Sequence, residues 1–331
     1  MIDFEVRTDL AVEEQEHASG ELSGVSLREW READSGIKLS EVRILNEHGS
    51  EAMGKPQGTY LTLELAPLTD SAPACQSLAA RSLARQIRKL ARQISADRRL
   101  TSVLVTGLGN RLVTADSLGP ETVDNLQVTH HLTKPLSAGT AAGSTACGQL
   151  SDCPKRPHAA LPSLRALSPG VMAQTGMETA QILRGVIRET RPDLLIVIDA
   201  LAARSITRLG TTIQLTDTGI RPGSGVGNHR HELTRESLGL PVLAIGVPTV
   251  VGAVAIVHDT VNAFLRALER SAAPIAAAMN AMDSDEQYEL IRELMEPEFA
   301  ALYVTPPNID EIVGLVSHVV AEGIQQALFL G

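Results

Sequence analysis

Two apolar runs, each associated with one aspartate, constrain the fold of this chain more than any other feature. Val103–Asn110 is followed by a turn-rich stretch that contains Asp116, and Pro192–Asp199 ends on its aspartate. Short apolar runs rich in Val, Leu and Ile are typical of strands buried in a parallel sheet. In open α/β sheets, ligands and reacting groups gather at the carboxyl ends of such strands. We therefore expect Asp116 and Asp199 to lie together at one end of a parallel sheet.

The remaining periodicity predicts an α/β fold. Residues 39–46 and 58–66 alternate apolar and polar side chains, as the two arms of a β-hairpin do. Further strands are predicted at 101–107, 193–199, 211–215 and 241–247, and helices at 75–95, 120–132, 177–190, 200–206, 258–270, 283–296 and 308–328. Strands that alternate with helices indicate a mostly parallel sheet with helices on both faces. The hairpin is expected to form a small β/helical appendage to this sheet.

Two stretches are expected to lie outside this framework. Residues 1–35 are polar and charged, which indicates a mobile leader followed by a surface element around Trp30, itself a packing residue. Residues 134–165 are rich in Ala, Gly, Ser and Pro, and we expect a flexible inserted loop there.

Composition narrows the possible functions. The 331 residues carry a formal net charge of −10, and only 2% of them are aromatic. An acidic chain with few aromatic rings is poorly suited to bind nucleic acid directly. The three cysteines, Cys75, Cys147 and Cys153, lack CxxC spacing, so we expect a reducing cytoplasm and neither a disulfide framework nor a zinc site. No uninterrupted apolar run long enough for a membrane span is present, and the N-terminus does not resemble a signal peptide.

Asp116 and Asp199 can each be interpreted in two ways. Either could simply cap a helix, Asp116 ahead of Pro120 and Asp199 ahead of residues 200–206. Two carboxylates that lie close together cannot both ionise easily, so one of them retains a proton. The ionised carboxylate can then activate water, while the protonated one polarises a carbonyl and protonates a leaving amine. The residues alone leave both interpretations open.

Other motifs are weaker. Val105–Asn110 is followed by Leu112, where a dinucleotide-binding loop would need glycine, and it lacks the lysine of a Walker loop, so a tight strand-to-loop turn is expected. The pairs in His130–His131 and His229–His231 have no third ligand at suggestive spacing, which favours surface or structural histidines and no metal cofactor. Gly223–Gly225 is only a fragment of the serine-hydrolase pattern.

A set of longer motifs resembles the germination protease family of spore-forming bacteria. The resemblance covers nearly the whole chain apart from parts of 20–100, 134–165 and 270–300. The motifs are Arg7–Glu13, Val105–Asn110, Val113–Pro120, Val128–Leu132, Pro169–Glu178, Ile198–Ser205, Asp217–Asn228, Gly246–Val251, Asp259–Thr260 and Val304–Pro306. The chain departs from the family at His130, where arginine is usual.

The resemblance implies an endopeptidase of the aspartic type, in which Asp116 and Asp199 are the catalytic residues. It implies a hydrolase that degrades small acid-soluble spore proteins during spore germination, in the cytoplasm of the forespore and spore core. It further implies a fold similar to that of hydrogenase maturation proteases, assembly as a homotetramer, no cofactor, and synthesis during sporulation as a self-processing zymogen. By the same resemblance, the chain cuts itself between Asp9 and Leu10, which makes 1–9 a propeptide and 10–331 one peptidase domain.

Substrate contacts are expected from the Gly-rich loops and from nearby cations, since such loops bring backbone groups close to a ligand. Candidate substrate-binding residues are Asn110, Thr175, Arg204, Ser205, Gly223, Gly225 and Asn228. Arg204, Arg221 and Arg230 are the cations nearest to these motifs in the sequence. Two alternatives stay open, a nickel-dependent maturation peptidase and a non-catalytic oligomeric protein that binds peptides.

Overall fold

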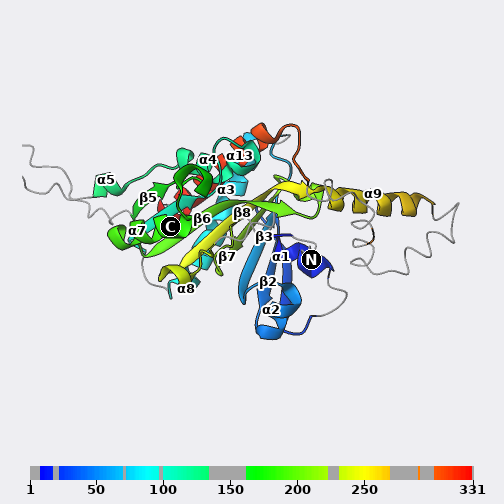
Figure 1. Ribbon diagram of the computed structural model, residues 1–331, viewed down its shortest axis with the longest axis horizontal. Coiled ribbons are helices and arrows are strands. Elements are labelled where there is room, and N and C mark those ends of the chain that lie inside the picture. Colours follow the sequence, from blue (N-terminus) through cyan, green and yellow to red (C-terminus); the bar gives the residue numbers. More distant parts are fainter. Residues whose placement is uncertain are drawn as a thin grey trace, which may run out of the picture.

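The computed structural model describes residues 8–17, 22–69, 72–96, 100–133, 162–222, 231–268, 290 and 302–329. Its centre is a nine-stranded sheet in the order β1-β2-β3-β7-β8-β6-β4-β5, with β9 paired to β8 (Figure 1). The strands are β1 Val25–Arg31, β2 Lys38–Ile44, β3 Gly58–Glu64, β4 Ser102–Gly107, β5 Ser163–Leu167, β6 Leu194–Ala203, β7 Thr212–Thr216, β8 Val242–Gly252 and β9 Tyr303–Val304.

The sheet has a parallel half and an antiparallel half. β5, β4, β6 and β8 pair in parallel, whereas β7 and the β1–β2–β3 meander pair antiparallel. The predicted α/β class, with its parallel centre, is therefore confirmed. The predicted hairpin is also confirmed, and it continues the same sheet through the pairing of β3 with β7.

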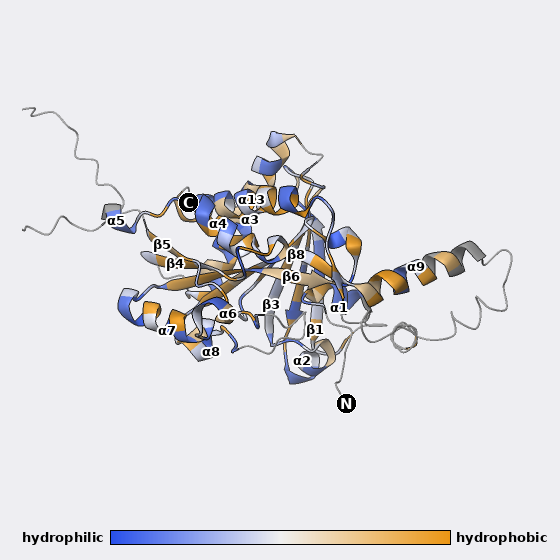
Figure 2. Ribbon diagram, turned by 45° about the horizontal axis from the view of Figure 1, so that its top comes forward, coloured by the Kyte–Doolittle hydropathy of each residue, from blue (hydrophilic) through white to orange (hydrophobic). Residues whose placement is uncertain are grey.

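Helices cover both faces of the parallel half (Figures 1 and 2). The helices of the described residues are α1 Ala11–His17, α2 Glu47–Met53, α3 Pro73–Ile94, α4 Leu118–Asn125, α5 His130–Thr133, α6 Met172–Thr175, α7 Thr179–Thr190, α8 Arg235–Leu238, α9 Ala253–Leu268 and α13 Ile309–Phe329, with the 3-10 turns η1 Thr114–Asp116 and η2 Ile206–Arg208. Of these, α1 and α2 lie beside the antiparallel strands β2 and β3. In β6, Ile196 and Ile198 face the core under α3 and α13, and Leu195 and Val197 face α7, as strand alternation requires.

The helix α13 is long and apolar because it is a core helix. It packs against α3 and α4, and residues such as Val313, Val320 and Ile324 are buried. By length and composition it is the one described helix that could cross a membrane, yet half of its apolar window is buried inside the structure. Burial against two neighbouring helices accounts for its hydropathy.

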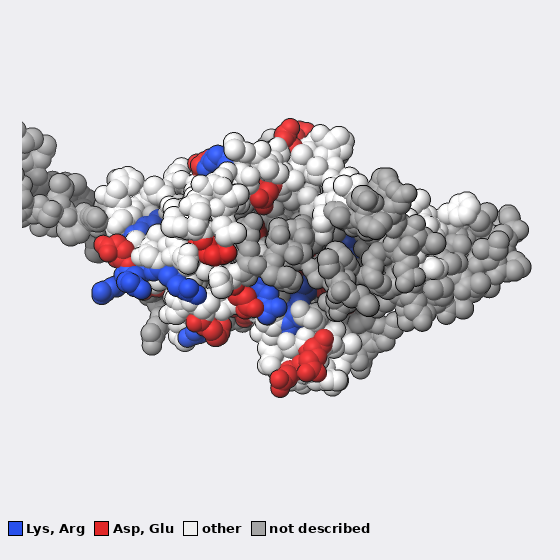
Figure 3. All heavy atoms as spheres, viewed as in Figure 1, with Lys and Arg blue, Asp and Glu red and all other residues white. Residues whose placement is uncertain are grey.

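The basic face of α3 pairs with acidic residues of the antiparallel half. Arg85 forms an ion pair with Glu32, and Lys89 approaches Glu41 at 2.7 Å. Trp30 packs partly buried against the core with Lys89 over its ring, which confirms its role as a packing residue. On the face shown in Figure 3, basic and acidic side chains of the described residues lie interspersed. Ion pairs with neighbouring carboxylates therefore account for part of the basic face of α3.

Several predicted boundaries were wrong. The helix expected at 200–206 is absent from those described residues, because β6 continues to Ala203 in register with β8. The insert expected to reach residue 165 ends earlier, since β5 begins at Ser163 and pairs with β4. The predicted hairpin loop contains α2, α4 ends at Asn125 and α9 begins at Ala253. Residues 134–161 and nearly all of the helix predicted at 283–296 lie outside the described residues.

Candidate active site

The topology places a switch point between β4 and β6. The chain leaves β4 through η1 and α4, which pack on the α13 face, and it enters β6 from α7 on the other face. β4 and β6 are neighbours, and their connections run in opposite directions along the sheet. Such reversals open a crevice beyond the carboxyl ends of the strands, where α/β proteins bind ligands. The loop that carries Asp116 follows β4 at this point, and Asp199 lies on β6.

Glycines let the loop after β4 fold back tightly. A Cβ on Gly107 would overlap the carbonyl oxygen of Gly119, and a Cβ on Gly119 would overlap that of Leu108. Gly109 has φ of +107°, and a Cβ there would overlap the carbonyl oxygen of Asp116. Because these neighbours are backbone atoms, only glycine fits. The expected tight strand-to-loop turn is confirmed, and it presses the Asp116 turn onto the end of β4.

Asp116 ends η1 and closes its own loop. Its Oδ2 accepts a hydrogen bond from the backbone N–H of Asn110 at 2.8 Å. The Asn110 side chain in turn accepts from Gln174 Nε2 at 2.8 Å, which joins this loop to α6. The N-cap of α4 is Ser117, with no side-chain cap, so Asp116 is not the cap of that helix. The bond from the Asn110 N–H therefore fixes the Asp116 carboxylate within the loop that follows β4.

A β-bulge fixes the same turn from the other side. The register of β6 against β8 shifts between Leu201 and Ala202, which leaves Thr249 of β8 as the extra residue. Thr249 is buried, and its Oγ1 donates to the carbonyl of Ala115 at 2.6 Å. Its own carbonyl accepts from Thr305 at 2.9 Å. The bulge therefore supplies the side chain that attaches η1 to the sheet.

Asp199 lies within β6 and not beyond its end, which corrects the expected position. Its neighbour Ile198 pairs with Gly107, the last residue of β4, so Asp199 is the first residue of β6 past that strand. The side chain is buried, at 6% exposure, and its Oδ1 accepts from the N–H of Ala200 at 3.0 Å. Since Ala200 is in a strand, the helix-cap interpretation of Asp199 is wrong. η1, which ends at Asp116, packs against β6, the strand that carries Asp199, and against β8.

The other predicted site residues lie in different places, and Arg204 and Ser205 contact the N-terminal segment described next. Asn110 joins the Asp116 loop, and Thr175 Oγ1 bonds within its own loop to the carbonyl of Val171 at 3.3 Å. Arg221 forms an ion pair with Glu232 at 2.7 Å. Gly223, Gly225, Asn228 and Arg230 lie outside the described residues.

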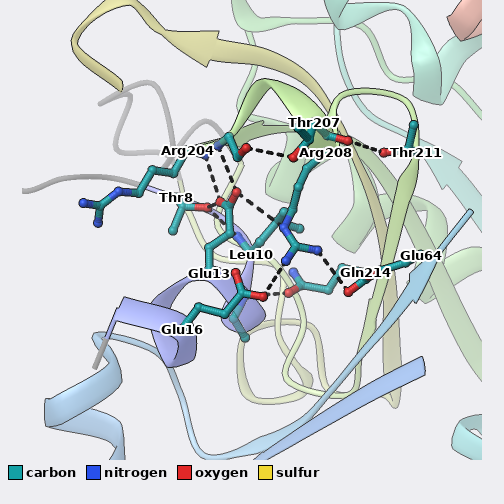
Figure 4. Close-up of polar contacts among 12 residues, drawn as sticks. Thr8, Leu10, Glu13, Glu16, Glu64, Arg204, Thr207, Arg208, Thr211 and Gln214 are labelled. Carbon is teal, nitrogen blue, oxygen red and sulfur yellow. Dashed lines mark hydrogen bonds and ion pairs between the residues drawn. The ribbon is translucent and has the colours of Figure 1, made fainter. Parts of the chain in front are cut away.

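The segment from Thr8 to Glu13, termed here the leader dock, is built into the protein (Figure 4). The expectation of a mobile leader is wrong for these residues, because Leu10 and Ala11 are fully buried. Asp9 bonds Ala202 of β6 twice, from its N–H to the carbonyl at 3.0 Å and from the Ala202 N–H to its Oδ2 at 2.9 Å. Apolar packing and strand-like bonds together hold the segment against the end of β6.

Gln214 of β7 brackets the Asp9–Leu10 peptide. Its Nε2 donates to the carbonyl of Asp9 at 3.0 Å, and its Oε1 accepts from the N–H of Ala11 at 2.8 Å. Lys55 Nζ donates to the carbonyl of Thr8 at 3.0 Å. Burial lowers the pKa of Lys55, and nearby carboxylates, Asp9 first, oppose that shift. Polar groups therefore hold the backbone on both sides of the predicted cut.

Glu13 anchors the far end of the dock. Its carboxylate accepts from the backbone N–H groups of Arg204 at 2.8 Å and Ser205 at 3.0 Å, and from the hydroxyl of Thr8. Arg208 lies 3.7 Å away and also pairs with carboxylates of α1 and β3 (Figure 4). Burial raises the pKa of Glu13 although these bonds and Arg208 oppose the shift. Arg204 and Ser205, predicted to touch substrate, contact the chain's own leader.

The sequence did not single out Lys55, Gln214, Arg208 or the carboxylate of Glu13. Gln214 carried the one available signal, as a polar residue between Ile213 and Leu215 in a short apolar strand. A buried polar group needs a partner, so its position indicates a bond within the protein. Lys55 and Arg208 stand in polar surroundings that give no such signal.

Among the described residues, no three His, Cys, Asp or Glu side chains lie together as a group that could hold a metal ion. His130 is at the β5 edge, where its Nδ1 lies 2.8 Å from Ser163 Oγ and its Nε2 lies 3.3 Å from Arg165. It has the structural role that the sequence favoured.

Two aspartates at the switch point of a parallel sheet define an α/β protein with a candidate hydrolytic centre. The germination protease family model matches residues 4–277. Germination protease of Caldanaerobacter subterraneus subsp. tengcongensis is 44% identical over 98% of this chain and 94% of its own length, and that of Clostridium tetani is 37% identical over 98% and 95%. The chain belongs to the germination protease family, and the predicted family is confirmed.

A solved structure gives a more distant likeness. The NiFe hydrogenase maturation protease HycI from Thermococcus kodakarensis KOD1 matches 47% of this chain and 80% of its own, with 15% identity and a TM-score of 0.27. That similarity is too low to carry an argument about the site. Family membership makes the protein a protease.

Proposed function

We propose that this protein is an endopeptidase that degrades small acid-soluble spore proteins during spore germination, in the cytoplasm of the spore core. One observation supports the site most directly: the 3-10 turn that ends at Asp116 packs against β6, the strand that carries Asp199, where β4 ends. Membership in the germination protease family supports the substrate class. The chemistry needs no cofactor in this proposal.

The proposed mechanism is attack of water on a peptide carbonyl, with one proton shared between Asp116 and Asp199. The ionised carboxylate accepts a proton from water while the protonated one polarises the carbonyl and later protonates the leaving nitrogen. The two acids titrate as a coupled pair, so neither is assigned alone as base or acid. Without either carboxyl group, the other cannot both accept the proton from water and donate one to the leaving nitrogen, so the reaction is abolished.

The protein is further proposed to be made as a homotetrameric zymogen that cuts itself between Asp9 and Leu10. Two features support this. The bond lies in the leader dock against Ala202, three residues beyond Asp199 on the same strand. Gln214 and Lys55 hold the chain around the bond in an ordered position. Residues 1–9 would leave, and 10–331 would remain as the peptidase domain.

Substrate contacts are proposed at two places. Asn110 and Thr175 belong to loops joined by the Gln174–Asn110 bond beside the Asp116 turn. Arg204 and Ser205 lie where β6 ends, and with Gly223, Gly225 and Asn228 they are proposed to contact a bound polypeptide.

The test is digestion of a purified small acid-soluble spore protein by wild type, Asp116→Asn and Asp199→Asn. Asp124→Asn is the matched control, because Asp124 is an exposed partner of Arg111 close to the same loop. Both site variants should lose cleavage by about 10³-fold or more, while Asp124→Asn retains it. Retained activity in either site variant would refute the shared-proton mechanism.

The same assay separates the alternatives. A nickel-dependent peptidase would lose activity after chelation and regain it with the metal, whereas the proposed mechanism predicts no change. A non-catalytic peptide-binding protein would leave the substrate intact in every sample. N-terminal sequencing of the wild type tests the cut independently, since any new start other than Leu10 contradicts the proposed processing site.

A further inference from the structure

One hydroxyl group links the two sides of the proposed cut. Thr8 Oγ1 accepts a hydrogen bond from the N–H of Leu10 at 3.1 Å. The same hydroxyl donates to Oε2 of Glu13. The nitrogen of Leu10 and the Glu13 carboxylate therefore lie on either side of a single oxygen atom, deep in the leader dock.

Cleavage at this bond changes the charge on one side of that oxygen. Hydrolysis adds one water: Asp9 gains a carboxylate, and the nitrogen of Leu10 becomes a free amine that takes up a proton near neutral pH. Thr8 leaves with residues 1–9. The carboxylate of Glu13 then lacks the hydroxyl donor, and the new ammonium lacks its acceptor.

Leu10 itself is held in place by contacts that the cut does not remove. Its side chain is fully buried among residues of β6, β8 and α9, including Leu201, Val251 and Val254. Ala11 keeps its bond to Gln214, and Glu13 keeps its bonds to the amides of Arg204 and Ser205. The new N-terminus is thus retained next to Glu13, and an unpaired buried ammonium would be costly.

We propose that Glu13 binds the new α-ammonium group of Leu10 once residues 1–9 have gone, so that the leader dock becomes the binding site for the mature N-terminus. This inference rests on the proposed self-processing. The contact would replace two hydrogen bonds through Thr8 with one direct ion pair. Because Glu13 also binds the end of β6, the pair couples cleavage to the strand that carries Asp199.

The surrounding charges are compatible with this pair. Arg208 approaches the other oxygen, Oε1, at 3.7 Å and divides its charge among the acids of α1 and β3. Lys55 loses the carbonyl of Thr8 and the nearby Asp9 when the leader departs. Glu14 and Glu13, which both act on the charge of Lys55, stay on α1, and the hydroxyl of Thr8 no longer occupies Oε2 of Glu13. Glu13 Oε2 is then available to the ammonium.

The experiment uses a chain that begins at Leu10, released from an N-terminal fusion by the fusion's own protease so that self-processing is not required. The α-amine is labelled with acetic anhydride at pH 7.5, and the product is quantified by mass spectrometry of the N-terminal peptide. A paired ammonium stays protonated and unreactive, so labelling should be at least about tenfold slower in the folded protein than in urea.

Variants identify the partner. Glu13→Gln should label about tenfold faster than the Leu10-start wild type, and Glu14→Gln, which removes a neighbouring carboxylate from the same helix, should not. A chain with one added alanine before Leu10 moves the amine away from an intact Glu13 and should also label fast. This extended chain keeps the test valid if Glu13→Gln fails to fold.

Equal labelling of the Leu10-start wild type and the alanine-extended chain would overturn the pairing. A fast-labelling wild type would do the same. The proposed cut is judged separately, because sequencing of self-processed protein can reveal another start while the Leu10-start chain still shows a protected amine. The two proposals therefore fail by different results.

Discussion

The switch point attaches chain to the end of β4 and the leader dock attaches chain to the end of β6, but they do so by different means. At the switch point, backbone meets backbone: Gly107 against Gly119, and Gly109 against the carbonyl of Asp116. At the leader dock, side chains reach across about 200 residues of sequence, as Gln214 does to Asp9 and Ala11. The first arrangement is part of the fold, whereas the second fastens a separate segment to it. The second arrangement can be lost one bond at a time, whereas the first cannot be altered without changing the fold.

The largest effect is expected where the backbone contact is closest. Gly107→Ala places a methyl group against the carbonyl oxygen of Gly119, so it should cost about 3 kcal/mol or more of unfolding free energy, or displace the Asp116 loop and abolish cleavage. Gly185→Ala is the control, since Gly185 lies in α7 with nothing near its added Cβ, and it should stabilise by about 1 kcal/mol. Urea unfolding and substrate digestion measure both. A stable, active Gly107→Ala protein would show that close backbone contact at the switch point is not required.

A smaller effect is expected from Gln214, which holds Asp9 and Ala11 of the leader dock. Gln214→Leu leaves the carbonyl of Asp9 and the N–H of Ala11 without their partner, at a cost of about 2 kcal/mol. Limited proteolysis should then cut the leader faster, while the Asp116 loop stays protected. Gln174→Leu removes an exposed bond to Asn110 and should cost less than about 1 kcal/mol. Equal rates of proteolysis of the leader dock in the two variants would contradict the role given to Gln214.

Arg208 tests the charged end of the dock. Arg208→Ala removes the cation shared by Glu13, Glu16 and Glu64 and should cost about 1–2 kcal/mol, because the side chain is mostly buried. Arg221→Ala breaks one exposed ion pair with Glu232 and should cost less than about 1 kcal/mol. Chemical unfolding at low and high salt compares them. A larger cost for Arg221 than for Arg208 would contradict the assignment of Arg208 to the dock.

The smallest effect is expected in how the free energy of unfolding changes as the pH is lowered. Burial raises the pKa of Glu13, so its folded form takes up a proton before the unfolded chain does, and folding is favoured as pH falls from the raised pKa toward 4.5. Burial also acts on Glu32, but bonds from Arg85 and Ser35 outweigh it and hold the pKa of Glu32 low. The stability from Glu32 is present above 4.5 and is lost as pH falls through its folded pKa.

Removing each group should therefore change the pH profile in opposite directions. Glu13→Gln should make the loss of stability on acidification steeper, and Glu32→Gln should make it shallower. The measurement is the urea midpoint of each variant and of the wild type at intervals between pH 3 and pH 7. Parallel profiles for the two variants would show that the dock carboxylate is no different from an ordinary ion-paired one.

The sequence predicted the parallel strands and the main helices, because apolar runs follow local periodicity, and it located Asp116 in the loop after β4. It missed the extension of β6 past Asp199, since Ala200–Ala203 has helix-forming composition and only pairing with β8 makes it a strand. It treated Thr8–Val12 as mobile because this short segment shows no period of its own and the residues around it are polar and charged. Burial of Leu10 depends on partners from β6, β8 and α9, which are remote in sequence.

The bulge at Thr249 has a consequence for side-chain parity along β8. Because successive strand residues face opposite ways, one extra residue reverses which of the later positions point to each layer. The hydroxyl of Thr249 anchors the Asp116 turn, and the reversed parity directs Val251 into the cluster around Leu10. One inserted residue therefore affects both the Asp116 turn and the packing around Leu10. Thr249→Val removes only the hydrogen bond to the Asp116 turn, whereas deletion of residue 249 also reverses the direction of Val251, so the two effects can be separated by mutation.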